Sequence, residues 1–111
     1  MLNWQKYLLA GSQDKRISLN DLRVSVPKVK RYLGHSAEVC SLDWAEAEYF
    51  ASGGNGNKML VWSIKTNKFL FKGEHKGGVR GLAWSKKKKN FLFSGGGQGD
   101  NTIKKWNVDN Y

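Results

Sequence analysis

Short runs of apolar residues alternate with polar or glycine-rich turns along the chain. In its central part four runs follow one another, at residues 39–44, 49–52, 59–62 and 68–71, with turn-forming stretches at 45–48, 53–57 and 65–67. In the first run, period-two alternation places Val39, Ser41 and Asp43 on one face. The runs are rich in β-branched and aromatic residues, and no stretch keeps a helical period beyond a single turn. The pattern therefore predicts an all-β fold.

The pattern repeats. Trp4, Trp44 and Trp84 lie 40 residues apart, each two residues after a leucine, and His35 and His75 share the same spacing. A turn of small residues follows each tryptophan, with serines at positions 12, 52 and 94. Four short strands in a unit of this length are typical of a β-propeller blade of the WD-repeat type. In such blades, neighbouring sheets bury each other's faces.

We therefore expect part of a WD40-type β-propeller with about three four-stranded antiparallel blades, the first and last incomplete. The approximate blade boundaries are 1–33, 34–73 and 74–111, within one propeller segment over residues 1–111. The sequence predicts eleven strands, fewer than a closed ring of blades would need. An open arc exposes sheet faces and strand edges, so the separate chain is expected to be poorly soluble or oligomeric.

Four polar side chains are typically hydrogen-bonded within each WD repeat. They are a His before the first strand, a Ser or Thr in the second strand, an Asp in the next turn and a Trp in the third strand. The last unit contains all four, at His75, Ser94, Asp100 and Trp106. The middle unit contains His35, Ser52 and Trp62. The first unit keeps the Asp, at position 14, and has Asn20 in place of the Trp.

The middle unit lacks the carboxylate of this network. Gly56 lies six residues before Trp62, where the last unit has Asp100 six residues before Trp106. Unless Asn55, Asn57 or water takes its place, the missing carboxylate is expected to lower the stability of this blade by about 1 kcal/mol. We expect Gly56→Asp to raise the melting temperature. Because the set of residues recurs in each unit, we interpret it as structural and not as a Ser-His-Asp catalytic site.

The charge of the chain adds an alternative function. Lys and Arg number 19 against 9 Asp and Glu, which gives a net charge of +10. The charges are spread along the chain and only Lys86–Lys89 form a run, which favours a solvated surface. The alternative is a polyanion- or nucleic-acid-binding surface that uses this run with Lys104 and Lys105. Salt-dependent binding would support that alternative.

No catalytic, metal or cofactor motif stands out. Residues 95–99 are glycine-rich, but the Lys-Ser/Thr pair and the helix of a phosphate-binding loop do not follow. The two histidines and the single cysteine lack metal-ligand spacing. We expect Cys40 to lie in the core, and one cysteine fits a reducing intracellular compartment. No apolar run is long enough for a membrane span, and no leader is visible. We therefore expect a protein that is not an enzyme and binds no cofactor or metal.

Several segments in order resemble one family, the Fizzy and Fizzy-related coactivators of the anaphase-promoting complex. The segment 34–44 resembles the family's GHxxEVCxLxW, and 51–62 is similar to its ASGGNDNxLxVW. The segments 74–85, 94–107 and 10–23 match its EHxAAVKAxAWS, SGGGTxDxxIxxWN and SGSRDxxIxxxDxR patterns. The resemblance covers essentially the whole chain and concerns the third to fifth repeats of the family's seven-bladed propeller.

The resemblance implies a non-enzymatic adaptor that reads degrons and presents substrates to a ubiquitin ligase in cell-cycle control. It implies anaphase-promoting complex subunits and degron-bearing proteins as partners, and a nuclear and cytoplasmic location. Generic protein-interaction scaffolding is the alternative. By resemblance, Asn55, Asn57 and Gln98 contact the Lys-Glu-Asn degron, although Gln98 replaces the more usual Thr and Gly56 replaces Asp. The other interpretation is that Asn55 and Asn57 shape a tight turn.

Overall fold

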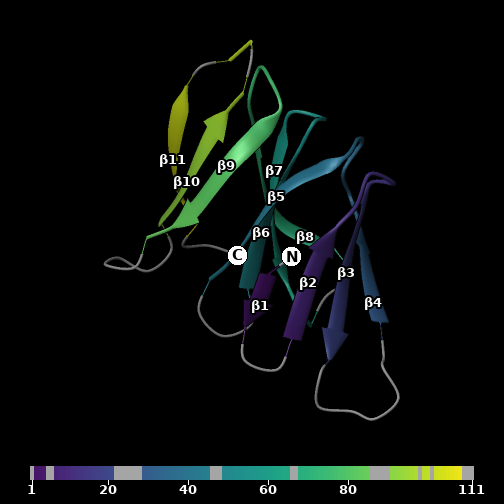
Figure 1. Ribbon diagram of the computed structural model, residues 1–111. Helices are drawn as coiled ribbons and strands as arrows, with labels where there is room; N and C mark the ends of the chain where they lie inside the picture. The colour runs from purple at the N-terminus through teal and green to yellow at the C-terminus, as the bar shows by residue number, and fades with distance from the viewer. Residues whose placement is uncertain are drawn as a thin grey trace.

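Three antiparallel sheets make up the described part of the molecule (Figure 1). The computed structural model describes residues 2–4, 7–21, 29–45, 49–65, 68–85, 91–97, 99–100 and 102–108. The first sheet contains β1 (Leu2–Trp4), β2 (Tyr7–Gly11), β3 (Arg16–Asp21) and β4 (Val29–Leu33). The second contains β5 (Val39–Trp44), β6 (Tyr49–Gly54), β7 (Lys58–Ser63) and β8 (Phe69–Glu74). The third contains β9 (Val79–Trp84), β10 (Phe91–Gly96) and β11 (Ile103–Asn107).

The all-β prediction is confirmed. Strands follow one another in each sheet in chain order, so every connection within a sheet is a hairpin. In the described ranges there is no helix, and hence none that could cross a membrane.

The second sheet is buried on both faces. On one face Phe50, Leu60 and Trp62 pack against the first sheet, and on the other Ala51 and Val61 pack against the third. All five are fully buried. Successive side chains of a strand point to opposite faces, so the same two strands supply both cores. The near-continuous apolar run in β7 is the consequence of this double burial.

A bulge changes the expected pattern of β5. The register of β5 against β6 shifts between Val39 and Ser41, so the alternation of faces is interrupted at Cys40. Val39 belongs to the core shared with the first sheet, whereas the Ser41 hydroxyl donates to the Val79 carbonyl of the third sheet at 3.2 Å. The prediction that Val39 shares a face with Ser41 and Asp43 is therefore wrong.

Two glycines predicted to lie in a turn instead extend a strand. Gly53 and Gly54 complete β6 and pair with β5. A Cβ atom on Gly53 would lie 2.6 Å from both the Ser41 hydroxyl and a Val79 methyl group. Glycine is therefore needed here for the close approach of the third sheet.

Polar contacts add to the packing between sheets. The Trp84 backbone N–H donates to the Asp43 carboxylate at 2.9 Å, and the Trp84 indole N–H donates to the Asp43 carbonyl at 3.2 Å. Between the first two sheets, Lys30 Nζ and the Tyr32 hydroxyl both donate to the Ile64 carbonyl, at 2.7 and 3.2 Å. These bonds fix the sheets relative to one another.

Five connections gather at one end of the sheets (Figure 1). They are β2–β3, β4–β5, β6–β7, β8–β9 and β10–β11, and we call this end the glycine-rich end. It holds the turns that contain Asn55 and Gly97, whereas β5, β7 and β9 end, and β6, β8 and β10 begin, at the opposite end.

Candidate functional site

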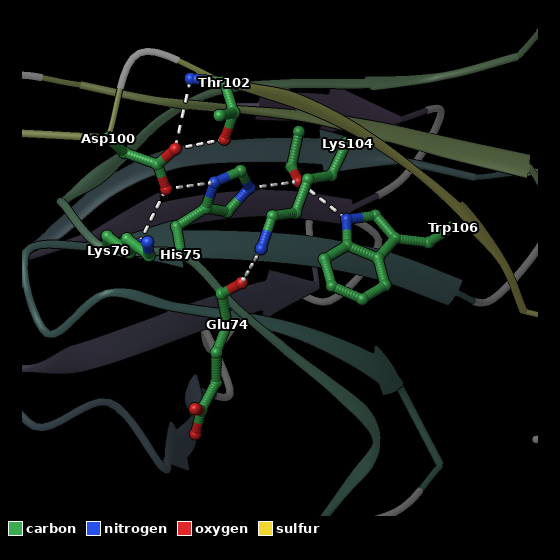
Figure 2. A network of polar contacts seen from close by, with 8 residues as sticks. Glu74, His75, Lys76, Asp100, Thr102, Lys104 and Trp106 are labelled. Atoms are coloured by element: carbon green, nitrogen blue, oxygen red, sulfur yellow. Dashed lines mark hydrogen bonds and ion pairs between the residues drawn. The ribbon is translucent and has the colours of Figure 1, made fainter.

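A continuous hydrogen-bonded chain runs through the third sheet (Figure 2). The Trp106 indole N–H donates to Ser94 Oγ at 2.7 Å, and Ser94 Oγ lies 2.7 Å from His75 Nε2. His75 Nδ1 lies 2.8 Å from Asp100 Oδ2. Because the Asp100 carboxylate can only accept, we assign the His75 proton to Nδ1, and a neutral His75 then accepts from the Ser94 hydroxyl at Nε2.

Asp100 satisfies several donors at once. Its carboxylate accepts from the Lys76 backbone N–H at 2.7 Å and from the Thr102 backbone N–H at 3.1 Å. It also accepts from the Thr102 hydroxyl (Figure 2). The Thr102 hydroxyl, the Lys76 N–H and His75 lower the pKa of Asp100 well below its ordinary value, against an opposing effect of burial. The third sheet thus has a complete network in which the buried His75 has a partner on each ring nitrogen.

The second sheet repeats this chain only in part. The Trp62 indole N–H donates to Ser52 Oγ at 2.8 Å, and Ser52 Oγ lies 2.6 Å from His35 Nε2. His35 Nδ1 is buried and finds no hydrogen-bond partner among the described residues. Neither Asn55 nor Asn57 therefore supplies the missing acceptor. Burial, with a smaller contribution from the positive charge of Lys58, lowers the pKa of His35 to about 4.

Of the Trp–Ser–His–Asp network, the first sheet has the aspartate in its turn, and Asn20 replaces the tryptophan. Asp14 is exposed in the β2–β3 connection, where its backbone N–H donates to Ser12 Oγ at 3.2 Å. A hydrogen bond from the Ser12 side chain lowers the pKa of the Asp14 carboxyl. Asn20 lies on β3 opposite Leu8.

Asn55 is exposed and held at the boundary between the second and third sheets. Its backbone N–H donates to the Glu38 carbonyl at 2.9 Å, and its side-chain NH₂ donates to the Glu38 carboxylate at 3.4 Å. The Arg80 guanidinium donates to Asn55 Oδ1 at 3.3 Å. A Cβ atom on Gly78 would lie 2.7 Å from that oxygen. The amide is thus positioned by two oppositely charged side chains that the sequence reasoning did not identify.

Asn57 makes backbone hydrogen bonds that shape the β6–β7 turn. It has a φ of 67°, a left-handed conformation that asparagine tolerates better than most residues. Its N–H donates to the Gly54 carbonyl at 3.2 Å, and its carbonyl accepts from the His75 N–H at 2.9 Å. These contacts favour the tight-turn interpretation for Asn57.

Gln98 lies outside the described residues, but the residue before it, Gly97, is held by a backbone hydrogen bond. The Gly97 N–H donates to the Gly78 carbonyl at 2.7 Å, which brings the β10–β11 connection against β8–β9. A Cβ atom on Gly78 would lie 2.7 Å from Asn55 Oδ1, so the β8–β9 connection lies between the two glycine-rich turns.

The two described lysines of the alternative, polyanion-binding surface contact other groups of the chain. Lys104 Nζ donates to the Glu74 carbonyl at 2.8 Å, and Lys105 Nζ lies 4.5 Å from the Phe91 ring centroid. The run Lys86–Lys89 lies outside the described residues. Cys40 is half-buried, and burial raises the pKa of its thiol, which disfavours a nucleophile. Within the described ranges no cluster of His, Cys, Asp and Glu could hold a metal ion.

Comparison with known proteins gives a consistent family. The family model described as "WD domain, G-beta repeat" matches residues 27–63 and 66–107. Protein FIZZY-RELATED 3 of Arabidopsis thaliana is 38% identical over 99% of this chain and 24% of its own length. The anaphase-promoting complex subunit cdc20 of Dictyostelium discoideum is 40% identical over 96% of this chain and 23% of its own length.

A solved structure supports the same assignment. A chain in the crystal structure of a mitotic checkpoint complex matches 97% of this chain with a TM-score of 0.90 and 33% identity, and this chain covers 34% of it. The expected resemblance to Fizzy and Fizzy-related coactivators and the partial WD40 propeller are thus confirmed. The chain spans about a quarter of the length of the curated relatives.

Proposed function

The chain belongs to the WD40 family of G-beta repeats, and on this premise we propose that it is a degron-reading segment of an anaphase-promoting complex coactivator. Its homologues are coactivators of this complex that act in cell-cycle control. The proposed activity is binding without catalysis. The proposed partners are subunits of the ligase and proteins that carry a Lys-Glu-Asn motif.

The observation that carries the proposal is the fixed, exposed amide of Asn55. An asparagine side chain offers both donors and an acceptor to a polar peptide. Glu38 and Arg80 hold this amide in one orientation through bonds of 3.4 and 3.3 Å, so less side-chain freedom is lost when a peptide binds. The two neighbours also place a negative and a positive charge beside the amide, which suits a motif that contains both Lys and Glu.

The test is fluorescence polarisation with a labelled peptide that contains Lys-Glu-Asn, compared with a peptide in which all three residues are alanine. We expect Asn55→Ala to weaken binding of the first peptide about tenfold, about 1.4 kcal/mol, because it removes the positioned amide. Asn107→Ala is the matched control, since Asn107 is an exposed asparagine on β11 at the opposite end. Equal affinity for both peptides, or equal losses in the two variants, would contradict the proposal.

A further inference from the structure

We propose that the second sheet contains a binding site for a carboxylate supplied from outside the chain, at His35. The second and third sheets have the same Trp–Ser–His chain, with corresponding distances of 2.6 to 2.8 Å. In the third sheet the chain ends on the carboxylate of Asp100. In the second sheet it ends on His35 Nδ1, which is buried and without a partner in the described part of the chain. The inference does not depend on the proposed degron function.

We assign the unpartnered atom as a donor by the parallel with His75, whose Nδ1 faces a carboxylate. Trp62 can only donate to Ser52 Oγ, so the Ser52 hydroxyl proton is free to point at His35 Nε2. A neutral imidazole that accepts at Nε2 carries its proton on Nδ1. His35 is only 7% exposed, and a buried donor without an acceptor is costly. An acceptor from outside the chain would remove this cost.

Gly54 and Gly56 supply no side chain at the place that Asp100 occupies in the third sheet, and the hydroxyl of Ser36 takes up part of that place. In the third sheet a Cβ on Gly96 would lie 2.6 Å from Asp100 Cβ and Cγ, so the aspartate occupies the space over that glycine. In the second sheet the corresponding Cβ on Gly54 would lie 2.9 Å from both His35 Nδ1 and the Glu38 carbonyl oxygen. Gly56 and Ser36 also border this place. Ser36 is exposed, and its hydroxyl oxygen would overlap a Cβ atom on Gly56. Ser36 can rotate about one bond to admit a ligand.

The surrounding donors and charge favour an anion. Asp100 accepts from the backbone N–H of Lys76, the residue after His75, and Ser36 is the corresponding residue after His35. Thr102, two residues after Asp100, donates to the second carboxylate oxygen. Lys58 occupies the corresponding position two residues after Gly56, and its positive charge contributes to the lowered pKa of His35. A carboxylate could therefore accept from His35 Nδ1–H and Ser36 N–H and pair with the Lys58 ammonium.

The test is a titration of the ¹⁵N-labelled full chain with sodium acetate, followed by NMR of the histidine ring nitrogens, with sodium chloride at equal ionic strength as reference. We expect a saturable shift of His35 Nδ1 in the millimolar range. His75 is an internal control, because Asp100 already occupies its Nδ1, and it should not respond. No response of His35, or equal responses of both histidines, would overturn the proposal.

Two variants make the test specific. Gly56→Asp supplies a carboxylate from within the chain, and we expect it to abolish the acetate response. Lys58→Met keeps the Trp62–Ser52–His35 chain and should weaken acetate binding about tenfold. An undiminished acetate response in Gly56→Asp would overturn the site.

The source of the carboxylate is distinguished with blocked pentaglycine peptides that carry a central Glu or Gln. Tighter binding of the Glu peptide than of acetate, with no response to the Gln peptide, supports an acidic side chain of a partner as the ligand. A response to acetate alone supports a small free carboxylate. Equal responses to the Glu and Gln peptides would overturn recognition of a carboxylate.

Discussion

Two histidines with the same burial have different surroundings in this molecule. His35 and His75 are 7% and 6% exposed, and each has a serine hydroxyl at Nε2. Only His75 has a carboxylate at Nδ1. The difference comes from one position in the turn before the third strand, which is Gly56 in the second sheet and Asp100 in the third. A single residue thus decides whether the polar network is closed.

The first prediction at this scale concerns Gly56→Asp. A carboxylate at this position would accept from His35 Nδ1 and stabilise the fold by about 1 kcal/mol, which raises the melting temperature by about 4 °C. Ser36 must rotate to make room, and it is exposed. The reciprocal variant Asp100→Gly opens the network of the third sheet and should lower the melting temperature. Calorimetry that finds no rise for Gly56→Asp while Asp100→Gly falls would argue against this account.

The second prediction concerns pH. The folded-state pKa of His35 is lowered from 6.5 to about 4, so the unfolded chain binds more protons between these values. The contribution of neutral His35 is complete above pH 6.5 and is lost as the pH falls towards 4. At pH 5 the free energy of unfolding should fall by about 2 kcal/mol from this group alone. The lowered pKa of Asp100 affects the free energy of unfolding at more acidic pH, below the ordinary pKa of aspartate.

Urea unfolding at pH 7.5 and pH 5 measures this effect. In Gly56→Asp the new carboxylate favours the protonated imidazole, so the loss between the two pH values should be smaller than in the unsubstituted chain. Equal losses in both proteins would show that His35 does not cause the acid sensitivity.

Residue chemistry was predictable from the sequence where it depended on spacing within one repeat. The spacing of Gly56 and Trp62 predicts that His35 lacks an aspartate, and the structure leaves Nδ1 without a partner among the described residues. The contacts of Asn55 with Glu38 and Arg80 were not predictable. Arg80 is 25 residues away in the chain, and its approach depends on how the second and third sheets pack.

At the scale of the elements, the predicted strands are present but their faces and ends differ in places. Alternation predicts that Val39 and Ser41 share a face, whereas the register shift in β5 separates them. A bulge leaves no clear signal in a pattern of apolar and polar residues, because it depends on the pairing of two strands. Gly53 and Gly54 carry a turn signal, yet they extend β6 because the neighbouring sheet needs their lack of side chain.

A matched pair of glycines tests this close approach. Gly53 and Gly95 occupy corresponding positions in β6 and β10, but only Gly53 is covered by a neighbouring sheet. Gly53→Ala should destabilise the fold by about 1–3 kcal/mol, because the Val79 side chain and the Ser41 hydroxyl must move. Gly95→Ala has no neighbour within 4 Å and should be neutral or stabilising by up to about 1 kcal/mol. Urea unfolding that gives equal effects for both variants would contradict the packing.

At the scale of the whole molecule, one outer face has no partner in the described residues. The second sheet buries both faces, whereas the outward face of the third sheet exposes apolar side chains. Ile103 is 81% exposed and Phe93 is 38% exposed, and the register of β10 and β11 puts them on the same face. The same positions in the second sheet are covered, so this face has the composition of a surface that packs against another sheet.

This surface predicts self-association of the separate 111-residue chain. We expect elution in gel filtration to depend on concentration, and we expect Phe93→Lys combined with Ile103→Lys to shift it towards the monomer. Gln13→Lys adds the same type of charge at an exposed turn elsewhere and should leave elution unchanged. A sharp monomer peak with cooperative unfolding for the unsubstituted chain would refute the prediction.

The central claim is that a polar peptide is read at the glycine-rich end, where the turns of the second and third sheets meet. Backbone amide NMR of the labelled chain during titration with a Lys-Glu-Asn peptide tests the location directly. We predict the largest shift changes at Asn55, Gly78 and Gly97, whose contacts join the two turns. Changes confined to the opposite end, around Ala45 and Ser85, or no changes at all, would contradict the account.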